Sequence, residues 1–142
     1  MKNHIKLYMI LFIVIFSLSL TYYSNSRDSR DKGIGPVKSL RLGPLDQAMV
    51  DKGKSIFNSK CVVCHSLYDK KIGPPLGKVA SDQTQEYIMN MLLNTAEMQQ
   101  KDERVRQLLV QFKVPMPPPN LSHEDARSVL EYLRATSEGK SN

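Results

Sequence analysis

The pentapeptide Cys61-Val62-Val63-Cys64-His65 constrains this chain more than any other stretch of its sequence. Two thiols three positions apart can add to the two vinyl groups of one porphyrin, and the histidine that follows places an imidazole beneath the iron. Covalent attachment also retains the porphyrin in a domain that is too small to enclose it. The motif therefore predicts one covalently attached haem c, with Cys61 and Cys64 as attachment points and His65 as the proximal axial ligand of the iron.

Two other interpretations of this motif stay open, a redox-active dithiol and part of a zinc site. A dithiol enzyme would need the motif at the start of a helix that follows a strand, in an α/β pattern that this sequence lacks. A zinc site needs four ligands, and only His4 and His123 remain to supply nitrogen. Two closely spaced cysteines are also too few for a disulfide framework. Haem attachment is therefore the favoured interpretation.

The composition is that of one soluble globular domain with an unusual start. The chain has 142 residues, of which 41% are hydrophobic and 24% charged, and its net charge is +6. Residues 7–20 carry no charge and follow a short basic stretch. This order predicts that residues 1–23 form a signal peptide or a membrane anchor. In either case we expect the rest of the chain to be exported, to the periplasm or the outer face of the cytoplasmic membrane.

Length and flanking residues point in different directions about the fate of this segment. A helix over residues 7–20 would span about 21 Å, less than the roughly 30 Å of hydrocarbon in a bilayer, which favours a cleaved signal peptide. A clean small-x-small cleavage site is missing, and Tyr22 and Tyr23 suit the aromatic belt of a retained anchor. Membrane attachment through residues 7–23 therefore stays open.

The remainder divides into a linker, a main domain and a tail. Residues 24–44 are rich in Ser, Gly, Arg and Asp and show neither helical nor strand periodicity, so we expect a flexible linker there. The main domain is expected over residues 45–137, and residues 138–142 form a short tail.

Apolar residues in the main domain recur at helical spacing. Helices are expected over residues 46–59, 84–94 and 102–112, and from Ser122 towards Gly139. Asp102 and Ser122 are suited to cap the last two. Because no segment alternates with period two for long enough to form a sheet, the sequence predicts an all-α domain.

The segment from Asp46 to Arg134 resembles a class I c-type cytochrome. Gly53 and Phe57 are similar to a glycine and an aromatic residue on the first helix of that family, which meet an aromatic on the last helix, here Tyr132. The resemblance implies the class I cytochrome c fold, in which four to five helices wrap around one covalently attached haem, here preceded by the N-terminal signal or anchor helix.

Two further segments carry the resemblance. The string Gly73-Pro74-Pro75-Leu76 is similar to the proximal loop of the family, in which a proline carbonyl accepts the proton of the haem-ligating imidazole. This implies that Pro74 serves His65. The segment from Tyr87 to Asn94, followed by a charged helix that contains methionine, is similar to small cytochromes of anaerobic respiratory chains, such as nitrous-oxide-type chains.

Met116 is the expected distal axial ligand among seven methionines. The others fall in the export segment or in predicted helices, where methionine normally fills the core. Met116 lies between Pro115 and the prolines at 117–119, which force an extended and stiff conformation. It also resembles the distal ligand loop of the family, a Met-Pro just before the last helix. Met98 and His123 remain the alternatives.

The chain is expected to interact with other redox proteins. Several lysines surround the attachment motif and could steer it towards a partner with an acidic docking face, although they could equally be ordinary solubilising residues: Lys52, Lys54, Lys60, Lys70, Lys71 and Lys78. Export and the modest net charge argue against nucleic acid as a partner.

These features predict a one-electron carrier and no enzyme. Its iron would cycle between Fe(III) and Fe(II) in a respiratory chain outside the cytoplasm, because ligation by His and Met suits electron transfer. No catalytic constellation is visible in the sequence. Two alternatives stay open: a haem-based enzyme or gas sensor with an exchangeable sixth ligand, and an anchored cytochrome subunit of an oxidase or reductase complex.

Overall fold

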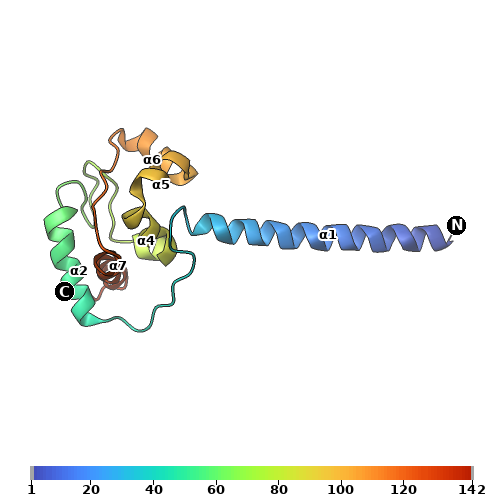
Figure 1. Cartoon of the computed structure of the whole chain (residues 1–142), viewed down its shortest axis with the longest axis horizontal. Helices are drawn as coiled ribbons and strands as arrows, with labels where there is room; N and C mark the ends of the chain where they lie inside the picture. The colour runs from blue at the N-terminus through green and yellow to red at the C-terminus, as the bar shows by residue number, and fades with distance from the viewer. Residues whose placement is uncertain (1, 142) are drawn as a thin grey trace. The chain divides into compact units, whose positions relative to one another are not determined.

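The computed structural model describes residues 2–141, and of residues 2–4, 7 and 22–30 it describes the backbone alone. Within this range the chain forms helices and no strands, which confirms the all-α prediction. The elements are α1 (Lys2–Asp31), α2 (Gln47–Lys60), α3 (Val79–Asp82), α4 (Gln85–Leu93), α5 (Thr95–Lys101), α6 (Glu103–Phe112) and α7 (His123–Ser137) (Figure 1).

The chain divides into two compact units, of which the first ends at Asp31 and the second begins at Lys32. The first unit is the single helix α1, whose apolar side chains from Tyr8 to Leu20 are exposed. Across the described residues, no helix combines the length and the apolar character needed to cross a membrane.

The structure differs from the expected flexible linker at residues 24–44. Its first part continues α1. Residues 32–45, the N-terminal arm, belong to the second unit and pack on the rest of it, with Val37 in the core. The physical reason is Asn90, which is fully buried on α4. Its side-chain oxygen accepts from the Val37 N–H, and its amide donates to the carbonyls of Val37 and Lys32, each at 2.9 Å. A buried amide needs such partners, so the arm is held in place.

Two further contacts fix the arm. The backbone N–H of Leu40 donates to Glu86 at 2.8 Å, and the N–H of Ile34 donates to the sulfur of Met98 at 3.0 Å. The compact domain therefore begins near residue 32, ahead of the boundary at residue 45 that the sequence predicts.

The core of the second unit is built where α2 packs against α7. Gly53 makes this close crossing possible, because an added Cβ would overlap the backbone carbonyl of Ser128. Phe57 and Tyr132 meet beside it with ring centroids 5.4 Å apart. The packing of Tyr132 against Gly53 and Phe57 thus agrees with the prediction.

Side-chain caps set the starts of the four main helices. Asp46, Thr84, Asp102 and Ser122 each accept a backbone N–H from the first turn of the helix that follows. This satisfies donors that have no partner within the helix. The four helices expected from the sequence are thereby confirmed, and the structure adds the single turn α3 and the bounds of α5.

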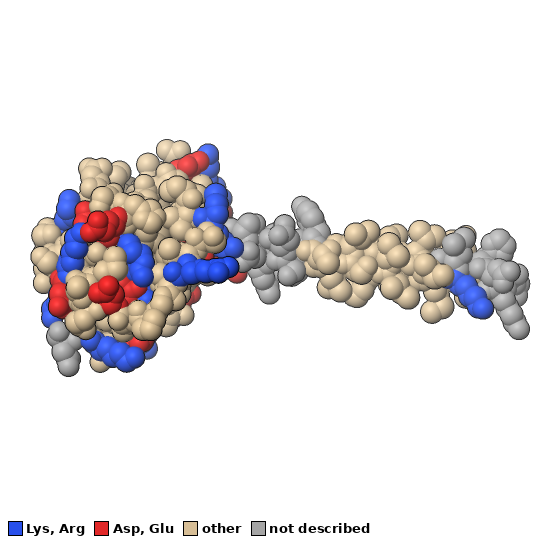
Figure 2. Space-filling model, turned by 60° about the horizontal axis from the view of Figure 1, so that its bottom comes forward, with Lys and Arg blue, Asp and Glu red and all other residues tan. Residues whose placement is uncertain are grey.

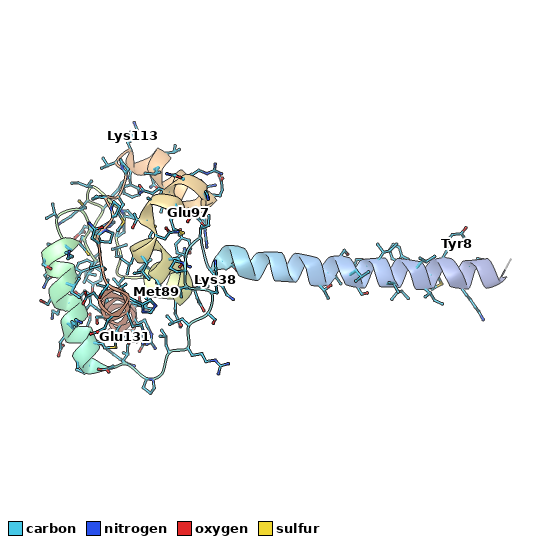
Figure 3. The ribbon with its side chains drawn as sticks, viewed as in Figure 1. Tyr8, Lys38, Met89, Glu97, Lys113 and Glu131 are labelled. Atoms are coloured by element: carbon cyan, nitrogen blue, oxygen red, sulfur yellow. The ribbon has the colours of Figure 1, made fainter. Side chains whose placement is uncertain are left out.

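The last helix carries a buried charge and a regular end. Glu131 is fully buried on α7, where Figure 3 labels it, and it pairs with Arg127 and with Arg134, the latter at 2.6 Å. Pairing of this kind is what allows a carboxylate to be buried. At the C-terminal end the N–H of Lys140 donates to the Ala135 carbonyl at 2.7 Å, around Gly139 with φ +72°. The first residues of the expected tail therefore close α7.

Candidate metal centre

The Cys61–His65 motif folds as a tight turn at the end of α2. The N–H of Cys61 donates to the carbonyl of Phe57 at 2.8 Å, and the N–H groups of Cys64 and His65 both donate to the Cys61 carbonyl. The N–H groups of Cys61 and Val62 donate to the Phe57 carbonyl near the end of α2, which has no partner within the helix, so the motif caps this helix. The two thiols and the imidazole are thereby carried on one turn.

His65 is buried, with 9% of its surface exposed, and its orientation is fixed by Pro74. Its Nδ1 lies 2.9 Å from the Pro74 carbonyl oxygen. Because a carbonyl can only accept, Nδ1 must carry the proton, which leaves Nε2 with a free lone pair. A neutral imidazole with Nδ1 bonded to a carbonyl is a well-suited metal ligand.

The loop that carries Pro74 is tied back to the motif. The N–H of Gly73 donates to the backbone carbonyl of Cys64 at 2.8 Å, and the N–H of Leu76 donates to the backbone carbonyl of Ser66 at 2.9 Å. Gly73 also packs flat on the imidazole, since an added Cβ would fall 2.8 Å from Nδ1 and closer still to Cε1. The ring is thus held by a hydrogen bond on one edge and by backbone on its face.

Above this turn lies one cavity, lined almost entirely by apolar side chains. Cys61, Cys64, His65 and Met116 all reach it. The other lining residues come from α2, α4, α5, α6, α7 and the loops between them, and include Phe57, Ile88, Met91, Leu92, Val105, Leu109, Phe112, Val129 and Leu133. The structure therefore brings together the two expected attachment points and the two favoured axial ligands.

The two alternatives to Met116 lie elsewhere. Met98 is fully buried beside Tyr87 and Val105, with its sulfur taken by the N–H of Ile34. His123 is exposed as the first residue of α7. Neither lines the cavity.

Met116 is held by a residue that the sequence analysis did not identify. Gln99, which also lines the cavity, accepts the Met116 N–H at 2.9 Å and donates to the Met116 carbonyl at 2.9 Å. No feature of the sequence indicated this pairing, because an exposed-looking glutamine on a short helix carries no motif. Asn90 was missed for a similar reason, although a polar residue amid the apolar positions of α4 was a usable signal.

The chemistry of the two cysteines bears on the dithiol interpretation. Both thiols are free, and Cys61 is buried. Burial raises the pKa of Cys61, and the nearby charge of Lys60 opposes this only in part. A redox-active dithiol depends on a lowered thiol pKa, so the environment of Cys61 does not favour disulfide exchange. Among the described residues, no three His, Cys, Asp or Glu side chains gather as a metal-binding group.

These residues fit a haem. A porphyrin needs an apolar slot, two thiols spaced for its vinyl groups, and a neutral nitrogen with a soft donor for the iron. The cavity would supply the slot, Cys61 and Cys64 the thiols, Nε2 of His65 the nitrogen, and the thioether of Met116 the soft donor.

The lysines around the motif do not form an unbroken positive surface. Lys52 pairs with Glu124 at 2.7 Å and with Asp125 at 3.0 Å. Lys71 donates to the Val62 carbonyl at 2.9 Å, and Lys70 lies over the Phe112 ring at 4.7 Å. Figure 2 shows acidic side chains interspersed with basic ones on the face in view.

Comparison with known proteins gives a consistent result. The family model "Cytochrome c" matches residues 50–137. A cytochrome c from Rhodothermus marinus is 38% identical, with a TM-score of 0.75, over 79% of this chain and 97% of that one. An engineered form of that cytochrome, also 38% identical, has a TM-score of 0.74 over 78% of this chain and 97% of that one. The same engineered protein bound to a carbene intermediate is 38% identical, with a TM-score of 0.71 over 78% of this chain and 97% of that one. The comparison with curated sequences found no match.

Proposed function

We propose a function for this chain, which belongs to the cytochrome c family and is a haem-based electron carrier with one covalently attached haem c. In this proposal, the iron is held between His65 and Met116. The protein works in a respiratory chain outside the cytoplasm. The observation that carries the ligand assignment is the shared cavity, which both side chains line together with Cys61 and Cys64. When bound, the haem iron supplies the one-electron chemistry.

Each residue then has a defined task. Cys61 and Cys64 hold the porphyrin by thioether bonds. The Pro74 carbonyl keeps the His65 proton on Nδ1, so that Nε2 faces the metal and the imidazole is a stronger donor. Met116 supplies a sulfur ligand, which raises the reduction potential in cytochromes of this kind. The apolar lining excludes water and keeps solvent reorganisation small when an electron arrives.

The alternative of a haem enzyme or gas sensor requires a sixth position that exchanges. One solved structure of the engineered Rhodothermus marinus cytochrome c has it bound to a carbene intermediate, which is a small ligand. In this chain the bonds from Gln99 to both backbone groups of Met116 support a permanent ligand. One spectroscopic experiment separates the electron carrier from the haem enzyme or gas sensor.

That experiment is an absorption and magnetic spectrum of the purified holoprotein and of Met116→Ala. We expect a low-spin wild type with a sulfur-to-iron band near the red end of the spectrum, and no such band in the variant. Met91→Leu is the matched control, because Met91 lines the same cavity and leucine preserves most of its volume. Survival of the band in Met116→Ala, or its loss in Met91→Leu alone, would overturn the assignment.

Export and partner choice form the second part of the proposal. The basic start and apolar run of residues 1–23 support export, as a cleaved signal or as a membrane anchor. The mass of the mature protein from a host that attaches haem c decides which. A mass that shows an intact N-terminus in a soluble cytoplasmic fraction would contradict export altogether.

We propose that the redox partner has an acidic docking face, and that Lys70 and Lys71 contribute to recognition. Both directly precede Ile72, which is 48% exposed and lines the cavity. Lys70→Gln combined with Lys71→Gln should slow electron transfer to an acidic redox protein at low salt and flatten its salt dependence. Lys140→Gln changes one charge near the C-terminus and serves as the control. An unchanged salt dependence in the double variant would contradict the proposal.

A further inference from the structure

We infer that Gln99 is the positioning residue of the sixth ligand: it holds the backbone of Met116 so that the thioether stays at the iron. This inference rests on the proposed function, in which Met116 is an axial ligand. It concerns a residue outside the haem-attachment motif and outside the proline-rich segment that carries the methionine.

The sequence of residues 114–119, the proline strap, leaves it with very few ways to be held. Proline has no backbone N–H, and positions 115, 117, 118 and 119 are all proline. Met116 therefore carries the single backbone donor between residues 115 and 119. The strap cannot join a helix or a sheet ladder, so its backbone is held through this one donor and through groups that donate to its carbonyls.

Gln99 takes that donor and the carbonyl of the same residue. Its Oε1 accepts the Met116 N–H at 2.9 Å, and its Nε2 donates to the Met116 carbonyl at 2.9 Å. A side-chain amide carries an acceptor and a donor side by side, so it can satisfy both backbone groups of a residue at once. The pair fixes the peptide plane on each side of the Met116 Cα, and with it the direction in which the side chain leaves.

Gln99 is itself well anchored. Its Nε2 also donates to the Thr95 carbonyl at 3.3 Å. The preceding residue, Met98, is fully buried, and its sulfur accepts the N–H of Ile34 in the N-terminal arm. The hydroxyl of Thr95 donates to Met91 at 2.7 Å and joins α5 to the end of α4. The short helix α5 is thus a fixed platform for the glutamine.

This arrangement has a consequence for ligand exchange. A small molecule such as imidazole can bind the ferric iron only when Met116 has left it, so its apparent affinity scales with the fraction of molecules in which the strap is open. The two bonds from Gln99 exist only in the closed position. Without them, the open fraction rises and imidazole binds more tightly, while the intrinsic affinity of the iron is unchanged.

The test is imidazole binding to ferric holoprotein, followed in the Soret band, for wild type, Gln99→Leu and Met116→Ala. Leucine keeps most of the volume of glutamine and removes both hydrogen bonds. We expect imidazole to bind about 30-fold more tightly to Gln99→Leu, since each neutral hydrogen bond contributes about tenfold or somewhat less. Gln100→Leu is the matched control, because Gln100 is exposed on the same helix; it should change the affinity by less than about twofold.

The outcomes separate the inference from the function it rests on. If Met116→Ala leaves imidazole affinity and the sulfur-to-iron band unchanged, Met116 is not the ligand, and both fail. If Met116→Ala strengthens imidazole binding while Gln99→Leu behaves like Gln100→Leu, the role of Gln99 alone is wrong.

A second variant covers the case in which Gln99→Leu does not fold. Gln99→Glu keeps an acceptor for the Met116 N–H but, as a carboxylate, has no donor for the Met116 carbonyl. It should give an effect in the same direction and smaller, with unchanged thermal unfolding setting it apart from a general loss of structure. Imidazole affinity equal to that of wild type in this variant would contradict the inference.

Discussion

The two sides of the haem cavity are held in different ways. On the proximal side, the attachment motif and the ligand occupy one turn, and the Pro74 loop is tied to it by the bonds of Gly73 to Cys64, Leu76 to Ser66 and His65 to Pro74. On the distal side, the Met116 backbone is held through Gln99, 17 positions away in sequence. Redundant short-range contacts hold His65, and one long-range pair of bonds holds Met116.

This difference indicates which side gives way first. Loss of any single proximal bond leaves two others and the covalent thioethers in place. Loss of the Gln99 pair leaves the proline strap with the bond from Lys60 to the Pro119 carbonyl at 3.3 Å, which touches the strap at its far end. We therefore expect the distal ligand to exchange while the haem and its proximal ligand stay fixed.

The largest expected effect is on the proximal side, from Cys61→Ser combined with Cys64→Ser. Without thiols no thioether can form, so no haem should remain on the chain after denaturation, whereas wild type and Met116→Ala should both retain it. A denaturing gel stained for haem, with the mass of the intact chain, measures this. Haem that stays on the denatured double variant would show that the covalent bonds to haem are not made by Cys61 and Cys64.

Gly73→Ala tests the packing of the proximal loop. An added methyl group would overlap the His65 ring, so we expect the free energy of unfolding to fall by about 3 kcal/mol. Gly43→Ala is the matched control, since an added Cβ there meets nothing within 4 Å. Denaturant unfolding followed by circular dichroism measures both. Equal stability of the two variants would mean that the imidazole is not confined by this backbone.

The features predictable from the sequence are those encoded over short distances. The attachment motif, the caps at Asp102 and Ser122, and the apolar stripes all act within one or two helical turns, and the structure has the corresponding helices. The contact of His65 with Pro74, nine positions apart, came from the resemblance to class I cytochromes c.

The features that escaped prediction depend on contacts between distant residues. The N-terminal arm looks like a linker by composition, but Asn90 binds Val37 across 53 positions. Gln99 gives no local sign that it faces Met116, because its partner is backbone and any residue at position 116 other than proline would offer the same groups. Polar side chains that bind distant backbone are the part of this fold that periodicity and motifs do not reveal.

On the distal side, Tyr87→Phe tests how that side responds to high pH. Burial, followed by the charge of Asp102, raises the pKa of Tyr87 from 10.0 to about 12. Between these pH values the unfolded chain releases the phenolic proton and the folded chain keeps it. The contribution of the Tyr87 phenol to the free energy of unfolding is therefore fully present below pH 10 and is lost as the pH rises towards 12. The loss should reach about 2 kcal/mol at pH 12.

Tyr87→Phe should remove this part of the alkaline loss, as measured by denaturant unfolding between pH 8 and pH 12 in steps. Tyr68→Phe is the control, because Tyr68 is 77% exposed. If the free energy of unfolding falls equally between pH 8 and pH 12 in wild type and Tyr87→Phe, the prediction is wrong, and another group causes the loss of stability at high pH.

The smallest expected effect comes from Ser122→Ala, which separates the two ends of the distal segment. Ser122 caps α7 just beyond the proline strap; its hydroxyl accepts the Asp125 N–H at 3.1 Å and donates to the Asp125 carboxylate at 2.7 Å. Loss of this cap should lower the free energy of unfolding by about 1 kcal/mol. Ser55→Ala, at an exposed position of α2, should change it by less than about 0.5 kcal/mol.

The same Ser122→Ala protein should bind imidazole almost as wild type does, because the cap acts on the helix and Gln99 acts on the ligand. If the affinity instead rises as much as in Gln99→Leu, the strap is held from α7 as well, and the distal ligand depends on two anchors. Ser122→Ala combined with Gln99→Leu then measures their coupling, since independent anchors give additive free energies and a shared one does not.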